Sequence, residues 1–118
     1  MKITFFETNQ WEKERIEYSP LAKGNQLRFI KAEFSPVPIK EFADSDILSI
    51  FIYSHLDAGA LNMLPQLKFI ATRSTGFDHI DVLESKKRGI VVSNVPSYGE
   101  NTVAEHTFAL ILSLSRNV

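Results

Sequence analysis

The sequence contains no cysteine, which excludes a disulfide framework and any zinc site built on thiolates. An excess of one charge is also missing, because 13 Lys and Arg residues are balanced by 14 Asp and Glu residues, for a formal net charge of −1. No basic patch and no block of like charges stands out along the chain. We therefore expect no nucleic-acid partner.

Long apolar runs are absent as well. The most apolar stretch covers residues 107–114, whereas a membrane-spanning helix needs roughly 20 residues. The first residues, MKITFFETNQ, lack the apolar region of a signal peptide. We expect no membrane partner and a cytoplasmic location. The 118 residues, 44% of them hydrophobic, suffice for one globular core.

Glycine is scarce, and its spacing excludes one motif. The glycines are Gly24, Gly59, Gly76, Gly89 and Gly99. They do not form the G-x-G-x-x-G pattern of a dinucleotide-binding loop. Because hydride transfer from a nicotinamide needs such a site and an acid–base residue, we expect no tightly bound cofactor in this chain alone.

The histidines His55, His79 and His106 show no repeated spacing with acidic residues, so we expect no metal site. His55 follows a predicted strand and is a lesser candidate for substrate contact. His79 is interpreted as part of a turn, and His106 as a structural helix residue. Arg73 could bring positive charge to an anionic ligand, but its position favours a surface arginine.

The sequence does contain a regular alternation of short β-rich runs and helical segments. The predicted strands are 2–6, 27–32, 47–53, 68–72 and 90–93. The predicted helices are 9–20, 40–43, 58–64, 82–88 and 102–117, and Pro36 and Pro38 break the chain between the second and third strands. The run 47–53 is almost continuously apolar, which is typical of a strand buried on both faces of a parallel sheet. A buried helix can show the same pattern.

This alternation predicts an α/β fold. We expect a flavodoxin-like, doubly wound, mostly parallel five-stranded sheet with strand order 2-1-3-4-5, followed by a long C-terminal helix. Asn9 and Glu12 fit a capping box at the first helix, and Thr102 and Glu105 show the same spacing at the last one.

Two predicted turns follow the fourth and fifth strands, and neighbouring strand ends of this kind bind ligands in open α/β sheets. Ser74, Thr75 and Gly76 follow the fourth strand. Their small side chains leave backbone N–H groups accessible, and such groups can hold a carboxylate. Taken alone, these residues fit an ordinary turn with glycine at positive φ better. Tyr98 follows the fifth strand and either faces the cleft or packs its loop against the core.

A resemblance to a known family rests on this same region. The segment ATRSTGFDHID, followed by VVSNVPSYGENTVAEHTFALILSLSR, resembles the N-terminal part of NAD-dependent D-2-hydroxyacid dehydrogenases, close to the D-lactate dehydrogenase branch. The resemblance implies an oxidoreductase that interconverts 2-oxo acids and D-2-hydroxy acids with NAD as cofactor. It implies that residues 74–76 receive the substrate carboxylate and that Tyr98 shapes the substrate pocket. Thr102 and Val103 would lie beside the nicotinamide end of the cofactor.

In the family, the glycine-rich loop and the catalytic Arg, Glu and His come later than the segment present here. We therefore interpret the chain as an N-terminal fragment, with no catalytic residue and no dehydrogenase activity of its own. Residues 1–100 would form a substrate-binding domain that a returning C-terminal segment completes, and residues 101–118 an interdomain helix leading to a dinucleotide-binding domain. Because that helix is apolar nearly all round, we also expect a homo-oligomer formed through it.

The alternative, from another class, is a stand-alone flavodoxin-like module that binds a ligand or regulates a partner. A receiver-type domain would show an acidic cluster after the first strand and an aspartate after the third. Instead, Glu7 stands alone and Tyr53 ends the third run. A flavin-binding module would need a phosphate loop rich in Ser, Thr and Gly after the first strand, which the sequence ETNQW matches poorly.

Overall fold

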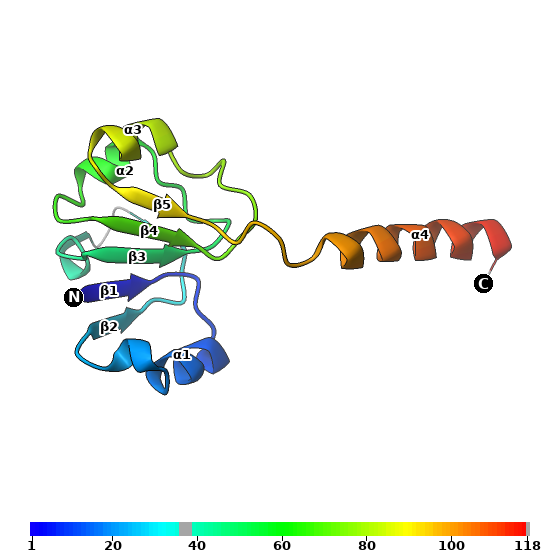
Figure 1. The fold of residues 1–118 in the computed structure, drawn as a ribbon, viewed down its shortest axis with the longest axis horizontal. Coiled ribbons are helices and arrows are strands. Elements are labelled where there is room, and N and C mark those ends of the chain that lie inside the picture. The colour runs from blue at the N-terminus through cyan, green and yellow to red at the C-terminus, as the bar shows by residue number, and fades with distance from the viewer. Residues whose placement is uncertain (36–38, 118) are drawn as a thin grey trace.

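The computed structural model describes residues 1–35 and 39–117, so the break expected at Pro36 and Pro38 lies outside the described residues. In the described part, the strands are β1 (Lys2–Phe5), β2 (Gln26–Phe29), β3 (Ile47–Ile50), β4 (Phe69–Thr72) and β5 (Val91–Ser93). They form a parallel sheet with the order β2-β1-β3-β4-β5 (Figure 1). The predicted α/β class and strand order are confirmed.

The helices are α1 (Gln10–Glu17), α2 (Ala58–Asn62), α3 (Val82–Lys87) and α4 (Glu100–Arg116), with short 3₁₀ turns at Pro20–Ala22 and Ile39–Glu41. The connection from β1 to β2 crosses the sheet in the opposite direction to the connections from β3 to β4 and from β4 to β5. Because such crossovers are right-handed, α1 covers one face of the sheet, and α2 and α3 cover the other.

The main apolar core lies on the face that α2 and α3 cover. Its buried members are Phe6, Phe34, Phe42, Leu48, Ile50, Leu56, Ala60, Leu61, Leu64, Leu67, Ile70, Ile80 and Ile90. Along β3, Leu48 and Ile50 alternate with Ser49, and all three are buried, as expected for a strand covered on both faces. On the α1 face, the Phe5 ring stacks on Phe29 with centroids 5.1 Å apart.

Several helix boundaries follow local signals in the sequence. The Glu12 carboxylate accepts a hydrogen bond from the Asn9 N–H at 2.8 Å, as the capping box predicts. Gly24 and Gly89 take φ values of 77° and 72°. This left-handed conformation lets glycine end a helix without strain.

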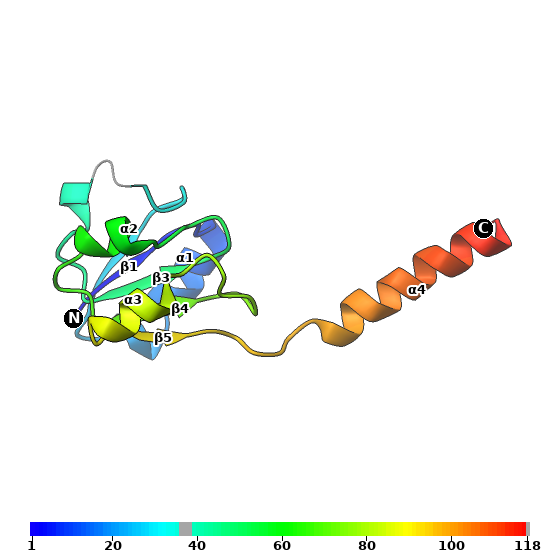
Figure 2. The ribbon, with the colours of Figure 1, turned by 90° about the horizontal axis from the view of Figure 1, so that it is seen from above.

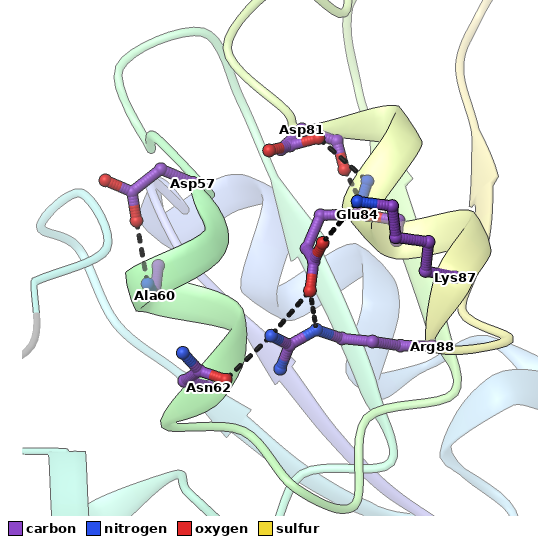
Figure 3. Close-up of polar contacts among 8 residues, drawn as sticks. Asp57, Ala60, Asn62, Asp81, Glu84, Lys87 and Arg88 are labelled. Carbon is purple, nitrogen blue, oxygen red and sulfur yellow. Dashed lines mark hydrogen bonds and ion pairs between the residues drawn. The ribbon is translucent and has the colours of Figure 1, made fainter.

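Figure 3 shows the polar contacts that begin α2 and α3 and join their ends. Asp57 Oδ1 accepts at 2.7 Å, and Asp81 Oδ1 at 2.8 Å, each from the backbone N–H three residues later, so each aspartate caps its helix. Arg88 at the end of α3 donates to Asn62 Oδ1 on α2 at 2.7 Å and to Glu84 Oε1 at 2.8 Å. These contacts fix the two helices against each other.

Two predicted strand ends are wrong. β3 stops at Ile50 rather than Tyr53, and β2 covers 26–29 rather than 27–32. Residues 51–53 leave the sheet and are partly or fully exposed. The amides of Phe51 and Tyr53 donate to a side chain, Glu7, instead of to a neighbouring strand. This contact replaces the strand pairing that the apolar run predicted.

The predicted capping box of the last helix is also wrong. α4 begins at Glu100 with Gly99 as its N-cap, so Thr102 lies inside the helix and Glu105 has no capping role. Ser97 Oγ donates to the Glu100 carboxylate at 2.8 Å. An acidic residue in the first turn also interacts favourably with the helix dipole. These contacts start the helix before position 102.

The helix α4 extends away from the sheet beyond the end of β5 (Figure 1, Figure 2). The molecule measures 56 × 34 × 24 Å, and at 1.5 Å per residue α4 contributes roughly 25 Å to its length. None of the 17 residues of α4 is buried against the described parts of the chain. Its exposed large apolar residues are Val103, Phe108, Leu110, Ile111, Leu112 and Leu114. No helix within residues 1–35 and 39–117 is long and apolar enough to cross a membrane.

Candidate functional site

The turns after β4 and β5 are held in place through three successive carbonyl groups. The Ser74 carbonyl accepts a hydrogen bond from Val95 N at 3.0 Å. The Thr75 carbonyl accepts from Asn94 Nδ2 at 2.8 Å. The Gly76 carbonyl accepts from the Ser74 hydroxyl at 2.8 Å. The two turns therefore lie side by side, as the parallel order of their strands predicted.

The same hydrogen bonds also fix the direction of the N–H group that follows each of these carbonyls. In a trans peptide, the C=O and the N–H that follows it point in opposite directions. Because the carbonyls of residues 74–76 turn toward their donors, the N–H groups of residues 75–77 turn away from those donors. Within the described residues, no hydrogen bond is donated by the backbone N–H of Ser74, Thr75 or Gly76. Backbone amides without a partner inside the protein can bind a carboxylate.

Ser74 is buried, and its side chain is hydrogen-bonded within the protein. It is 3% exposed, and its hydroxyl lies 2.5 Å from Thr72 Oγ1. His79 Nε2 lies 3.1 Å from the same Thr72 oxygen. Thr75 and Gly76, in contrast, are exposed. Ser74 is therefore nearly closed to solvent, whereas Thr75 and Gly76 are open to it.

Gly76 does not take a positive φ, so the ordinary turn considered from the sequence is not the turn that forms. A Cβ added at Gly76 would lie 3.3 Å from Asp78 Oδ1, which is a tight approach. Glycine is therefore favoured here by space and not by a left-handed backbone.

Tyr98 and the turn after β4 line one groove. Its volume is about 440 Å³, and its lining residues are Thr75, Tyr98, Gly99, Glu100, Val103 and Ala104. Tyr98 is 66% exposed, and its hydroxyl makes no hydrogen bond to a described residue, so its ring and hydroxyl are both available to a ligand. Val103 joins the groove from α4, whereas Thr102 is exposed outside the lining. The binding roles of these residues stay predictions.

At the crevice between β1 and β3, a carboxylate of the chain itself binds the backbone amides of the loop after β3. The strand order reverses at this crevice, and such a switch point is the usual ligand position in a doubly wound sheet. The residue is Glu7, whose φ of 53° is uncommon for a residue with a side chain. Its carboxylate accepts from the N–H groups of Phe51, Tyr53 and Ser54 at 2.9, 2.9 and 3.2 Å, and from the Ser54 hydroxyl. An anionic ligand would compete with Glu7 here, which disfavours the receiver-type and flavin-binding alternatives.

Arg73 is a partly buried strut between strand ends and not the surface arginine that the sequence favoured. Its guanidinium donates to the carbonyls of Phe6 and Glu7 at 2.8 and 2.9 Å, and to Ser49 Oγ at 3.0 Å. Glu12 Oε1 lies 3.6 Å from its Nε. Burial lowers the pKa of Arg73, and the charges of Glu12 and Glu7 partly oppose this shift. The side chain ties the end of β4 to the end of β1.

The histidines take separate places in the fold. Among the described residues, no group of three or more His, Cys, Asp or Glu side chains could hold a metal ion. His55 is exposed, with its ring centroid 6.4 Å from that of His79, and it does not line the groove. His106 is exposed on α4. Burial lowers the pKa of the His79 imidazole; Asp78 opposes this shift, His55 reinforces it and Glu7 opposes it.

A comparison with known protein families decides where this fold and these turns belong. The model of the D-isomer specific 2-hydroxyacid dehydrogenase catalytic domain matches residues 3–115. The chain belongs to this family. The family resemblance read from the sequence is thereby confirmed.

Relatives of this chain include proteins named glyoxylate reductase, 2-hydroxyacid dehydrogenase homolog and D-lactate dehydrogenase. The glyoxylate reductase of Thermofilum pendens is 40% identical over 80 residues, which are 68% of this chain and 24% of that protein. The D-lactate dehydrogenase of Staphylococcus aureus is 32% identical over 117 residues, covering 98% of this chain and 36% of the relative. The chain thus spans about a third or less of the length of these relatives.

A solved structure shows the same fold. The D-lactate dehydrogenase from Aquifex aeolicus, crystallised with NAD and lactic acid, superposes with a TM-score of 0.85 at 38% identity. The match covers 95% of this chain and 33% of the Aquifex chain. The expected likeness to the D-lactate branch is therefore present in both sequence and structure.

The residues of this family member do not fit a dinucleotide by themselves. The five glycines form no phosphate-binding pattern. Of the two residues predicted beside the nicotinamide, Val103 lines the groove and Thr102 does not.

Sequence reasoning missed the roles of Glu7, Arg73 and Asn94. The partners of Glu7 lie 44 to 47 residues away, and the carbonyls that Arg73 binds lie 66 and 67 residues away. No local pattern announces contacts of that range. Asn94 carried the one usable signal, because a side-chain donor directly after a strand can reach the neighbouring turn.

Proposed function

We propose that this chain is the substrate-binding part of a D-2-hydroxyacid dehydrogenase, which interconverts a 2-oxo acid and a D-2-hydroxy acid with NADH and NAD. The observation that carries the proposal is that the amides of Ser74, Thr75 and Gly76 have no partner in the described chain and that this turn contributes Thr75 to the groove at Tyr98. The relatives named glyoxylate reductase and D-lactate dehydrogenase support it, because glyoxylate and lactate both carry a carboxylate.

The amides recognise the substrate carboxylate without any charged side chain. Hydrogen bonds from backbone N–H groups to a carboxylate are stronger than those between neutral groups. Donors already held in place need no reorganisation when the ligand arrives. Tyr98 bounds the space next to the amides, so its ring limits the side chain that the acid can carry. The substrate is therefore a small 2-oxo or 2-hydroxy acid.

In this proposal, the dinucleotide site and the acid–base group are supplied from outside the 118 residues. Residues 1–100 act as the substrate-binding domain, and residues 101–118 as an interdomain helix. Thr102 and Val103 stand near the start of α4, where the nicotinamide end of NAD approaches the substrate. The chain alone has no dehydrogenase activity and no tight NAD site. The proposal also includes a homo-oligomer formed through α4 and a cytoplasmic location.

A grafting experiment tests this function. Residues 1–118 replace the matching segment of the Aquifex aeolicus D-lactate dehydrogenase, and NADH oxidation is followed with pyruvate and with glyoxylate. The proposal expects turnover by the graft and none by the 118-residue chain alone. Tyr98→Ala in the graft should change KM for the 2-oxo acid more than kcat. Turnover by the isolated chain, or a folded graft that binds NADH and reduces neither acid, contradicts the proposal.

A further inference from the structure

Beneath the free amides, three buried side chains form a continuous line of hydrogen bonds. His79 Nε2 lies 3.1 Å from Thr72 Oγ1, which lies 2.5 Å from Ser74 Oγ. Ser74 Oγ lies 2.8 Å from the Gly76 carbonyl oxygen. His79, Thr72 and Ser74 are 7%, 2% and 3% exposed, so water competes little for these bonds. The line runs from the imidazole to the turn that borders the groove.

The direction of each bond in this line follows from counting hydrogens. A carbonyl oxygen can only accept, so the single hydroxyl hydrogen of Ser74 goes to Gly76. Ser74 must then accept from Thr72, and Thr72, with no further hydrogen, must accept from His79. The Nε2 of His79 therefore carries a hydrogen. All the bonds point the same way, and hydrogen bonds aligned in a chain strengthen one another.

We propose that His79 is a positioning residue for the carboxylate-binding turn and acts through two buried hydroxyl groups on the Gly76 carbonyl. This inference rests on the function proposed for that turn. Holding the Gly76 carbonyl against Ser74 also holds the N–H of Phe77 in the opposite direction, because both belong to one peptide group. His79 itself touches no ligand. It fixes the peptide group that joins Gly76 to Phe77 and, through the Ser74 side chain, the turn that carries the free amides of residues 74–76.

His79 is itself held at a fixed place. Its backbone carbonyl accepts from Leu56 N at 2.9 Å, and the Leu56 carbonyl accepts from Asp81 N at 2.9 Å. Leu56 is fully buried, and Asp81 caps α3. The loop after β3 and the residue that caps α3 therefore fix the backbone that carries the imidazole. A fixed donor at this point can determine the orientation of the turn.

The first test needs no ligand. Long-range ¹H–¹⁵N spectra at about pH 8, where a histidine of ordinary pKa is neutral, report which imidazole nitrogen carries the hydrogen. The proposal expects hydrogen on Nε2 of His79. Hydrogen on Nδ1 overturns it, because Thr72 would then have no donor on that side.

The second test compares His79→Leu, His79→Gln, Ser74→Ala and the double variant with both His79→Leu and Ser74→Ala. Glutamine restores an N–H donor near the place of Nε2, whereas leucine keeps apolar volume without a donor. His79→Leu and Ser74→Ala should each lower the backbone order parameters of residues 75–77. Each should also weaken the binding of sodium oxamate, a small carboxylate probe, by about fivefold, which is the contribution of one neutral hydrogen bond.

The pattern among the variants separates positioning from a general structural role. His79→Gln should match the wild type in both measurements, and the double variant should be no worse than Ser74→Ala, because both changes break the same line. Additive losses, or an equal loss in the glutamine and leucine variants, overturn the proposal. If His79→Leu does not fold, the order parameters and the oxamate binding of Ser74→Ala and His79→Gln are compared with those of the wild type.

The two proposals fail in different ways. If oxamate leaves the wild-type signals unchanged while the imidazole hydrogen and the order parameters follow expectation, the substrate-binding function falls and the orienting role of His79 stands. If oxamate binds at residues 74–76 but the variants show additive losses, the function stands and the role of His79 falls.

Discussion

Asn94 donates from Nδ2 to the carbonyl oxygen of Thr75 at 2.8 Å, and this bond joins the turn after β5 to the turn after β4. It turns the Thr75 carbonyl toward β5 and thereby turns the Gly76 N–H away from β5. The orientation of the free amides thus depends on Asn94, which lies outside the turn that carries them. Changes at Asn94 should therefore affect ligand binding more than stability.

The variant Asn94→Asp tests this dependence. It replaces the donor by a negative charge, which repels the Thr75 carbonyl and an incoming carboxylate. We predict oxamate binding weakened by at least about fivefold, since one hydrogen bond contributes about 1 kcal/mol. The measurement is an amide-shift titration of the ¹⁵N-labelled chain.

Asn25→Asp is the matched control for Asn94→Asp. Asn25 Nδ2 donates to the Leu21 carbonyl at 2.8 Å, a bond of the same kind at the opposite end of the sheet. The control should bind oxamate like the wild type. Equal weakening in both variants would mean that added charge, and not the link between the turns, causes the loss.

Arg73→Lys should destabilise the fold, because lysine cannot reach the set of acceptors that the guanidinium fork satisfies. The carbonyls of Phe6 and Glu7 would lose donors in a partly buried place. We predict a loss of about 2 kcal/mol in the free energy of unfolding, measured by urea titration. Arg88→Lys should cost less than about 1 kcal/mol, because the Arg88 guanidinium binds the side chains of Asn62 and Glu84 and no backbone carbonyl. A loss at Arg88 as large as that at Arg73 would contradict the strut assignment.

Stability should depend on pH through His79. Burial lowers the pKa of its imidazole; Asp78 and Glu7 oppose this shift and His55 reinforces it. The unfolded chain therefore binds more protons than the folded chain, and stability falls as pH drops through about 6.5, the ordinary histidine pKa.

We predict that His79→Gln, which has no titrating group, reduces the loss of unfolding free energy between about pH 7.5 and pH 5.5. Urea titrations at a series of pH values measure this loss. His106→Gln, which removes a histidine exposed on α4, is the control. Profiles that change equally in the two variants would rule out a particular contribution of His79.

Self-association should depend on the apolar surface of α4. Leu112 is 58% exposed on a helix that is not buried against the described chain, and exposed apolar area of this kind favours association. We predict concentration-dependent association of the wild type in analytical ultracentrifugation and weaker association of Leu112→Glu. Ser115→Glu adds the same charge to the same helix without removing apolar area and should associate like the wild type. A wild type that stays monomeric at high concentration would contradict the prediction.

Features that depend on neighbouring residues could be predicted from the sequence. The apolar run at 47–53 and the alternation of elements predicted the parallel sheet and its order. Gly89, which ends α3 with a positive φ, acts within its own turn of helix. The two turns of the candidate site could be placed together because parallel strands end at the same edge of a sheet.

Features that depend on distant partners could not be predicted. β3 ends at Ile50 because Glu7, more than 40 residues earlier, takes the amides of residues 51, 53 and 54. Arg73 looks like a surface residue in the sequence because its acceptors come from β1 and β3. The start of α4 was misplaced for a local reason, since Ser97 and Glu100 pair ahead of the expected capping box.

The most direct measurement is an oxamate titration of the wild-type, ¹⁵N-labelled chain followed at each amide. We predict that the largest shifts occur at the N–H groups of Ser74, Thr75 and Gly76, with smaller shifts at Tyr98 and Gly99. Shifts centred instead on residues 51–54, where Glu7 already occupies the amides, would contradict it, as would an absence of any response.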